Sequence, residues 1–327
     1  MGLATYGAPV TSNNAPDVVA YLADFEAANL TVLPRDNVAH KFGWMDSTPT
    51  AKAGFLCGHQ LIRPDSVASD DHRTVFQGRD DGDRQRADAF SSQGTFDGWR
   101  EAIRPIEGFP RVRLAIYAAL ATPLLAVAHA VNFILSYSGV TSSGKTTALR
   151  SSASVWGCPD ERSPAAAINT WDATRVAIER VCALQDGLPL IVDDTKRASR
   201  REDVVTVLYD VASGQGRNRE SVDGLRRSDS FGTIMICSGE EPITSFSQDG
   251  GTRARTIELW GSPFGTVDGD TATLVANLNA GLQVHYGFAG PHFAKWLVEN
   301  EEHWPTWRER YRQWRGVYET SALSRLI

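Results

Sequence analysis

The sequence predicts an α/β protein with a P-loop NTPase core, and three observations support this. Residues Gly139–Thr146 match the pattern G-x-x-x-x-G-K-[ST], with an apolar run before them and a helix-prone run after them. A second apolar run, 188–192, ends in the acid pair Asp193 and Asp194. The chain has 327 residues, of which 42% are hydrophobic, so it is long enough to bury a large core.

Composition and charge exclude several classes of protein. The formal net charge of −6 argues against a protein that coats nucleic acid with its whole surface, so any nucleic-acid site must be local. The four cysteines lie far apart, without C-x-x-C spacing, and predict neither zinc nor disulfides, hence a reducing, cytoplasmic location. Residues 114–137 lack charge, yet Pro123 interrupts them, which favours a buried helix and strand over a membrane span.

The first 110 residues predict a small α+β unit. A short amphipathic helix is expected from Pro16 to about Asn29. Short apolar runs near 42–44, 54–58 and 74–78 are bounded by glycine and predict strands. A helix is expected to begin near Asp97, and an apolar helix from Val112 to about Ala130 then opens the core, which we place at 111–265.

The phosphate loop predicts a site for ATP and Mg²⁺. Gly139 and Gly144 allow backbone angles that a Cβ would forbid, Lys145 reaches the β- and γ-phosphates, and the Thr146 hydroxyl ligates Mg²⁺. Ser142, Ser143 and Thr147 complete the expected nucleotide contacts. The helix from Lys145 is expected to run to about Trp156. The alternative, a turn that binds nothing, leaves this spacing unexplained.

The acid pair after the second apolar run predicts the metal and water side of the site. A helix is expected over 172–185, followed by the strand 188–192, which we expect to lie beside the strand of the phosphate loop. Asp193 would then hold the metal, and Asp194 would act as general base for the attacking water. The alternative is an acidic turn without catalytic function.

Two later features predict contacts to the γ-phosphate. The strand 231–237 ends at Ser238, whose side chain would lie at the ligand-binding edge of the sheet and sense the phosphate. Arg253 and Arg255 precede the strand 256–260 and could neutralise the γ-phosphate, including that of a neighbouring subunit. A plain pair of surface arginines is the alternative.

A basic patch lies between the helix expected over 195–213 and the strand 231–237. It contains Arg217, Arg219, Arg226 and Arg227, with a turn expected at 223–224. We interpret it as a hairpin that touches the backbone of a nucleic acid in the channel of a ring. The alternative is a solvated hairpin that pairs with acidic neighbours.

The last part of the chain, 266–327, is expected to be helical. Five aromatic residues recur at spacings of three and four and predict one helical stripe that docks on the body: Trp304, Trp307, Tyr311, Trp314 and Tyr318.

With these motifs in place, the chain resembles the DUF927 family. The likeness spans most of the chain and rests on these segments: 43–44, 94–100, 140–149, 154–157, Trp171 with Thr174, 213–217, 238–240 and 285–291. The resemblance implies an AAA+-like or superfamily 3 helicase-like ATPase of phage, plasmid and other mobile-element proteins, often associated with a primase. It also implies that the basic hairpin occupies the position of a DNA-gripping loop. Asp194 departs from the pattern, since such ATPases more often carry Glu there.

The leading functional hypothesis is an Mg²⁺-dependent ATPase that forms a ring, a hexamer, and moves on single-stranded DNA as a helicase or translocase. A second hypothesis is a nucleotide-gated assembly module with slow turnover, which the shorter carboxylate of Asp194 favours. A third, a small-molecule kinase, shares the phosphate loop but gives the basic hairpin and the acid pair no joint purpose.

Overall fold

The core of the molecule is a five-stranded parallel sheet. The computed structural model describes residues 7–33, 36–45, 54–65, 74–216, 220–221, 224–225, 230–266 and 268–323. The strand order is β12-β6-β11-β8-β7, with every pair parallel. These strands are β6 (Phe133–Ser138), β7 (Ile168–Thr170), β8 (Leu190–Asp193), β11 (Ile234–Gly239) and β12 (Thr256–Trp260). The prediction of an α/β protein with a P-loop-type core is confirmed.

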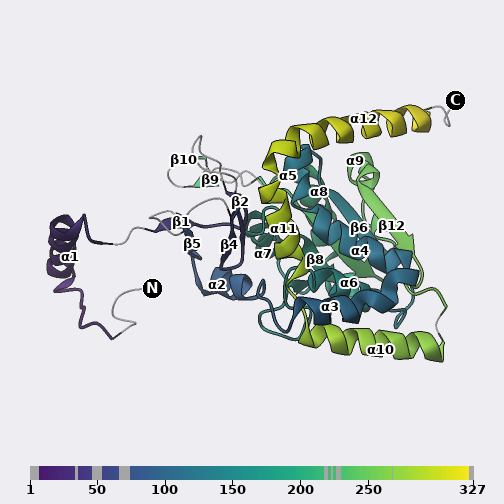
Figure 1. Ribbon diagram of the computed structural model, residues 1–327, viewed down its shortest axis with the longest axis horizontal. Helices are drawn as coiled ribbons and strands as arrows, with labels where there is room; N and C mark the ends of the chain where they lie inside the picture. The colour runs from purple at the N-terminus through teal and green to yellow at the C-terminus, as the bar shows by residue number, and fades with distance from the viewer. Residues whose placement is uncertain are drawn as a thin grey trace.

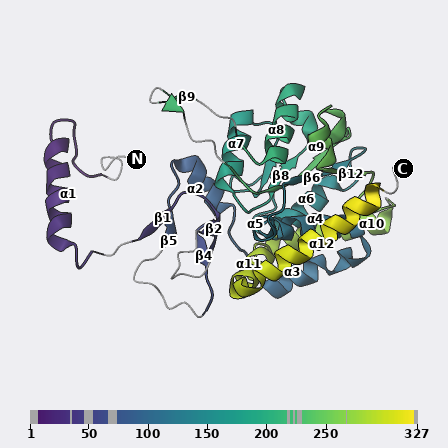
Figure 2. The same ribbon diagram turned by 90° about the horizontal axis from the view of Figure 1, so that it is seen from above.

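The apolar runs form buried strands because helices cover both faces of the sheet (Figures 1 and 2). Alternate residues serve two hydrophobic clusters, so that Ile236 packs on one side and Met235 and Cys237 pack on the other. The first side holds α4 (Pro110–Ala121) and α6 (Lys145–Ala153). The second side holds α7 (Arg175–Leu184) and α8 (Arg201–Ser213).

The order of the strands differs from our expectation at one point. β8, which ends in Asp193, does not pair with β6; β11 lies between them and pairs with both. From β6 the chain therefore crosses to β7 at the edge of the sheet, returns inward through β8 and β11, and then adds β12 on the other side of β6. Apolar runs report that a strand is buried but carry no information on its neighbour, so this order was not predictable from the pattern.

The N-terminal unit packs directly on the core. It contains the antiparallel sheet of β2 (Gly43–Met45), β3 (Gly54–Cys57) and β4 (Gln60–Ile62), the parallel pair of β1 (Asn37–Ala39) and β5 (Thr74–Phe76), and α2 (Asp81–Asp88). Phe42 and Phe55 belong to the same hydrophobic cluster as Trp156 of the core, and the rings of Phe55 and Trp156 lie 5.6 Å apart. The division of the chain at residues 110 and 265 remains a proposal.

Several elements depart from the expected boundaries. The single apolar helix expected from Val112 to Ala130 is two helices, α4 and α5 (Leu124–Ala128), because Pro123 has no N–H group with which to continue α4. α1 (Ala15–Asn29) forms as expected, but α7 begins three residues later than predicted, and the short strand β7 was not predicted. Among the described residues, no helix is long and apolar enough to cross a bilayer.

Helices form the C-terminal segment, as expected, and most of them cover the core. α10 (Gly269–Val284) packs on α3 (Phe96–Ile103) and α6, and α11 (Ala289–Glu299) packs on β3 and α4. The first half of α12 (Trp304–Leu323) docks on the body, where the rings of Trp304 and Trp44 lie 4.7 Å apart. The second half does not: Trp314 is 64% exposed, so the expectation that the whole aromatic stripe docks was wrong.

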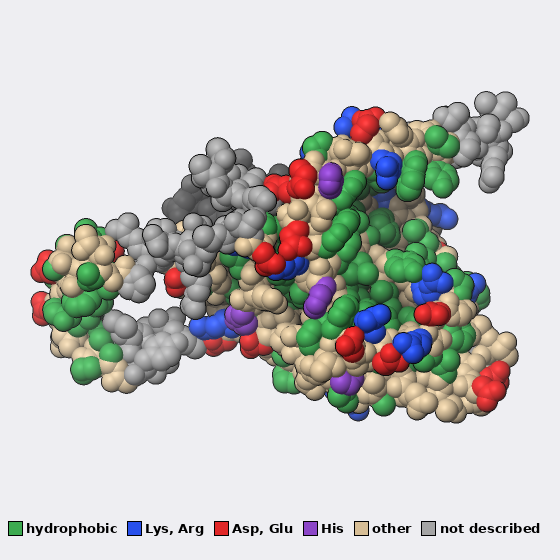
Figure 3. Space-filling model, viewed as in Figure 1, with side chains coloured by type: hydrophobic (Ala, Val, Ile, Leu, Met, Phe, Trp, Pro, Cys, Tyr) green, Lys and Arg blue, Asp and Glu red, His purple; other side chains and the backbone are tan. Residues whose placement is uncertain are grey.

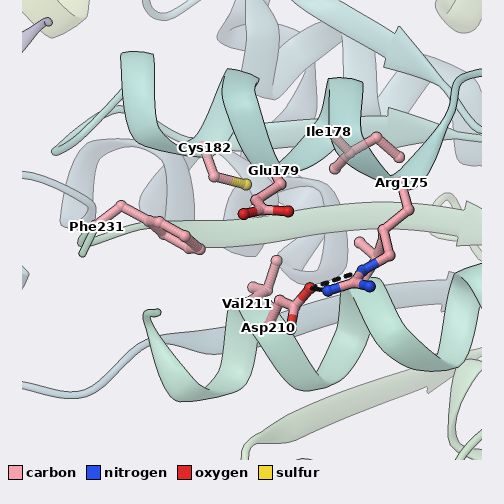
Figure 4. Close-up of a pocket in the computed structure, with 8 residues that line it drawn as sticks. Arg175, Ile178, Glu179, Cys182, Asp210, Val211 and Phe231 are labelled. Carbon is pink, nitrogen blue, oxygen red and sulfur yellow. Dashed lines mark hydrogen bonds and ion pairs between the residues drawn. The ribbon is translucent and has the colours of Figure 1, made fainter. Parts of the chain in front are cut away.

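A small pocket lies between α7 and α8 (Figure 4). Arg175 and Asp210 face each other across it, with Nη2 of the arginine 2.9 Å from Oδ2 of the aspartate. None of the residues that line this pocket is a predicted nucleotide or metal contact. The pocket is therefore separate from the candidate site.

Candidate nucleotide-binding site

The phosphate loop connects β6 to α6 through a backbone that glycine makes possible. Gly139 and Gly144 have φ angles of 149° and 88°, and Ser142, which is not glycine, has φ 59°. A Cβ on Gly144 would lie 2.7 Å from the ring of Phe264. The loop therefore turns tightly enough to bring its backbone close to a ligand at the N-terminus of α6.

Lys145 lies over the loop that precedes it. Its Nζ donates hydrogen bonds to the carbonyl oxygens of Gly139 (2.9 Å) and Val140 (2.7 Å). The residue is only 9% exposed, and its burial lowers the pKa of the ammonium group, although the nearby carboxylates of Glu240 and Asp193 oppose this effect. Neutral carbonyl oxygens thus hold Nζ in place. A phosphate oxygen could take their place and would form a stronger, charge-assisted contact with the ammonium group.

Asp193, at the end of β8, meets the phosphate loop although β11 separates the two strands. Its Oδ2 accepts a hydrogen bond from the Thr146 hydroxyl at 3.0 Å. Its Oδ1 accepts a hydrogen bond from the Ser238 hydroxyl, which comes from the tip of the intervening strand β11. The structure thus brings together three predicted site residues from three different elements.

Asp194 follows in a strained conformation. Its φ of 59° is left-handed, which costs about 1–2 kcal/mol in a residue with a Cβ. Two hydrogen bonds support it: its N–H donates to Ser238 Oγ at 3.2 Å, and its Oδ1 accepts from the N–H of Lys196 at 3.2 Å. The carboxylate thus caps the short 3₁₀ helix η3 (Thr195–Arg197).

A second charged network lies at the entrance of the loop. The carboxylate of Glu240, just beyond β11, accepts a hydrogen bond from the Thr141 hydroxyl and forms an ion pair with Lys196. These contacts, first with Lys196 and then with Thr141, lower the pKa of Glu240. Our sequence reasoning did not assign a role to Lys196 or Thr141. The signal for Lys196 was its place two residues after Asp194, on the turn that follows the metal strand.

Thr147 points away from the loop, toward the C-terminal helices. Its hydroxyl accepts a hydrogen bond from Asn279 of α10 at 3.2 Å, and Oδ1 of the same Asn279 accepts from Arg150 at 3.2 Å. The helix that begins at the phosphate loop is thus tied to α10 through side chains.

Arg253 and Arg255 lie where the parallel strands begin, whereas the phosphate loop lies where the strands end. The carbonyl oxygen of Arg255 accepts a hydrogen bond from the N–H of Ile134, close to the start of β6, whereas the loop follows the end of that strand. Both side chains are exposed. Within one chain the structure does not bring these arginines to the loop.

The expected hairpin between α8 and β11 is present in the backbone. β9 (Glu220–Ser221) pairs antiparallel with β10 (Gly224–Leu225). The four basic side chains and Asp223 of the expected turn lie outside the described residues: Arg217, Arg219, Arg226 and Arg227. The base of the hairpin is held by Asn132, whose Nδ2 donates to the carbonyl oxygens of Val211 (2.9 Å) and Phe231 (3.1 Å).

The donor set of the site fits Mg²⁺ and a nucleotide phosphate. Mg²⁺ binds oxygen ligands and commonly takes one or two carboxylates from the protein, together with phosphate oxygens. The Thr146 hydroxyl and the Asp193 carboxylate are such ligands, and they converge under the loop. The loop, the N-terminus of α6 and the Lys145 ammonium provide the complementary environment for an anion.

Comparisons with known proteins agree with this architecture. A family model described as a domain of unknown function, DUF927, matches residues 1–230. No curated protein matches the chain. A solved structure described as "SCCmec type IV Cch - active helicase" is similar, with a TM-score of 0.71 and 23% sequence identity. The match covers 92% of this chain and 53% of the other, so this chain spans about half the length of that helicase.

Proposed function

This chain belongs to the DUF927 family, and from that premise we propose that it is an Mg²⁺-dependent ATPase that acts on DNA as a motor, a helicase or translocase of a mobile element. The observation that carries the proposal is the contact between Thr146 and Asp193 under the phosphate loop. A loop that only bound phosphate would not require a metal-binding carboxylate from a separate strand.

The chain's own residues divide the work of binding. Backbone N–H groups of the loop 139–144 and the first turn of α6 bind the phosphates, and Lys145 exchanges its carbonyl contacts for phosphate oxygens. Thr146 and Asp193 would hold the metal, while Ser238 fixes the orientation of the Asp193 carboxylate. Mg²⁺, when bound, neutralises charge on the phosphate oxygens.

Activation of the attacking water is assigned to Asp194. One carboxylate oxygen caps η3, which anchors the side chain and leaves the second oxygen to accept a proton from the attacking water. Ser238 also bonds the N–H of Asp194, so a change at the γ-phosphate sensed by Ser238 would reach both acids.

The motor requires more than one subunit. Because Arg253 and Arg255 lie at the far edge of the sheet, we assign them to the nucleotide of a neighbouring subunit in a ring, which we take to be a hexamer. The basic hairpin lies at the start of β11, on that same far edge, and is assigned to single-stranded DNA. The similar solved structure is described as a helicase, which agrees with this assignment, and a primase is the protein partner suggested by the family resemblance.

One observation favours the second candidate function, a nucleotide-gated assembly module. The Asp194 carboxylate is already engaged as a cap, in a strained backbone conformation, which is compatible with slow turnover. In that case ATP would hold an oligomer together instead of driving movement.

Substitution of Lys145 tests the ATPase. Lys145→Ala should reduce ATP turnover by at least about a hundredfold, since the loop loses its only ammonium, while the thermal midpoint of unfolding stays close to wild type. Lys295→Ala is the control, because Lys295 is exposed and pairs with Asp65 outside the site. Equal turnover in Lys145→Ala and wild type would refute the proposal.

The two candidate functions separate in one further experiment. Turnover is measured with and without single-stranded DNA, and the mass of the oligomer is measured with ATP and with ADP. A motor shows turnover stimulated by DNA. A switch shows an oligomer that ATP assembles and ADP releases, with turnover indifferent to DNA.

A further inference from the structure

We propose that α1 of one copy of this chain binds the outer half of α12 of a second copy, so that the chain assembles head to tail. Figures 1 and 2, which are perpendicular views, both place α1 and the free end of α12 at opposite ends of the molecule. The proposal names the contact for the ring suggested above, but it depends on surface chemistry alone and not on nucleotide turnover.

α1 has an apolar face that nothing in the described part of its own chain covers. None of its residues is buried, and Tyr21 and Phe25 are 65% and 46% exposed. Val18, Leu22 and Phe25 follow one another at spacings of four and three, which places them on one side of the helix. Such a face gains free energy only by packing against another apolar surface.

α12 offers an apolar surface that begins on the body and continues past it. Trp307 stacks on Trp296 of α11, with the ring centroids 5.1 Å apart, so this part of the helix is anchored. About two turns further on, Trp314 and Val317 are 64% and 67% exposed. Figure 3 shows hydrophobic side chains both on this part of α12 and on the body below it.

The charges of the two helices are complementary. α1 carries Asp17, Asp24 and Glu26 and no basic residue, a net charge of −3. α12 as a whole carries four arginines and two glutamates, a net charge of +2, although Arg308 donates to the carbonyl oxygen of Val127 on the body and Arg312 pairs with Glu309 of the same helix. Arg310 of α12 is exposed, one turn before Trp314. Opposite charge around two apolar faces favours their association and discourages α1 from pairing with a second α1.

A second copy is the occupant that satisfies both helices at once. Each chain carries the acidic helix α1 at one end and the basic helix α12 at the other. The α12 of one neighbour can therefore cover α1, and the α1 of the other neighbour can cover α12. A contact between two different surfaces is heterologous, and it closes into a ring or extends into a filament according to the angle between neighbours. Head-to-tail order is also what a neighbour-supplied Arg253 requires.

The apolar part of the proposal is tested by the mass of the full chain in sedimentation velocity over a range of concentrations. Wild type should associate. Leu22→Ser with Phe25→Ser, and separately Trp314→Ser, should each weaken association at least about tenfold. Val176→Ser, an exposed apolar residue of α7, is the matched control and should have no effect. A monomeric wild type, or either set of variants associating as wild type does, overturns the proposal.

Two further measurements exclude damage to the fold as the cause. Asp24→Lys with Glu26→Lys, and Arg310→Glu with Arg312→Glu, should each weaken association, and combining them in one chain should restore it to within a few-fold. Mixing the Leu22/Phe25 variant with the Trp314 variant leaves one intact contact for each pair, so dimers should form and larger species should not. Failure of the charge swap to restore association, or a mixture that stays monomeric, contradicts the head-to-tail contact.

Discussion

At the scale of single residues, the candidate site places an anionic side chain where an anionic ligand is expected. Glu240 bonds Thr141 of the phosphate loop and holds the ammonium of Lys196 at the same time. A phosphate that enters the loop must approach the Glu240 carboxylate, and the two negative charges repel each other. The phosphate and the carboxylate also compete for the ammonium group of Lys196. We therefore expect Glu240 to weaken nucleotide binding without being a phosphate ligand.

Glu240→Gln should raise the affinity for ATP about two- to tenfold, because the amide removes the repulsion and releases Lys196 toward the phosphates. Titration of nucleotide binding measures the effect. Glu241→Gln is the control, since Glu241 pairs with Arg201 at the surface. Equal affinities in the two variants would show that Glu240 acts only as a structural cap.

The same substitution has a defined pH dependence. The contacts with Lys196 and Thr141 lower the pKa of Glu240, so the carboxylate stays ionised below the usual range of glutamate. The difference in ATP affinity between wild type and Glu240→Gln should thus be complete at neutral pH and shrink only as the pH falls through the lowered pKa. A difference that vanishes already above the ordinary glutamate range would contradict the ion pair.

At the scale of elements, the close approach of α11 to the core depends on a glycine. The Cα of Gly290, near the start of α11, faces the ring of Trp156, and a Cβ there would lie 2.3 Å from it. Trp156 cannot withdraw, because it is fully buried and its Nε1 donates to the carbonyl oxygen of Ala119 at 2.9 Å. α11 therefore approaches the core more closely than a larger residue would permit.

Gly290→Ala should destabilise the protein by about 1–3 kcal/mol, because the methyl group forces α11 and Trp156 apart. The denaturant midpoint of unfolding measures this. Gly269→Ala, at the start of α10 with open space around its Cα, should change stability by less than about 1 kcal/mol. A Gly290→Ala midpoint equal to that of the control would mean that the helix shifts without cost.

The hairpin between α8 and β11 carries a prediction on nucleic acid. Arg217→Ala with Arg219→Ala should weaken single-stranded DNA binding and flatten its salt dependence by about one to two phosphate contacts. Arg100→Ala with Arg104→Ala, two exposed arginines paired with acids near α3, is the matched control. Unchanged DNA binding and an unchanged salt dependence would indicate that the hairpin is a solvated surface element.

At the scale of the whole molecule, different functional groups lie at the two ends of the parallel strands of the central sheet. The phosphate loop, Asp193 and Ser238 share the edge where the parallel strands end. Arg253, Arg255 and the hairpin share the edge where the strands begin. A complete catalytic site of the proposed kind thus needs residues from two copies of the chain.

Mixing of variants tests this division. Arg253→Ala should reduce turnover at least about tenfold, and Lys145→Ala should abolish it. Co-assembly of the two variants should recover part of the activity, because some sites then combine an intact Lys145 with an intact Arg253 from the neighbour. A mixture no more active than the sum of its components would indicate that Arg253 does not act between subunits.

Much of the fold and of the candidate site was predictable from local pattern. The phosphate loop, the strand that ends in Asp193 and the strand that ends at Ser238 are each encoded by a short run of adjacent residues, because apolar periodicity and glycine placement act locally. The extent of α4 and α5 was not predicted, since composition marked the segment as apolar while one proline decided where the helix breaks.

The sequence by itself thus determined the chemistry: a phosphate loop, two acids and a local basic patch on an acidic chain. Only the tertiary structure decided which of these groups meet. Strand order placed β11 between β6 and β8, so that Ser238 bonds Asp193. The parallel pairing of β12 with β6 put Arg253 where the strands begin, away from its own loop at their other end. The physical reason is that strand order and helix docking depend on contacts between residues far apart in the chain, which no local pattern records.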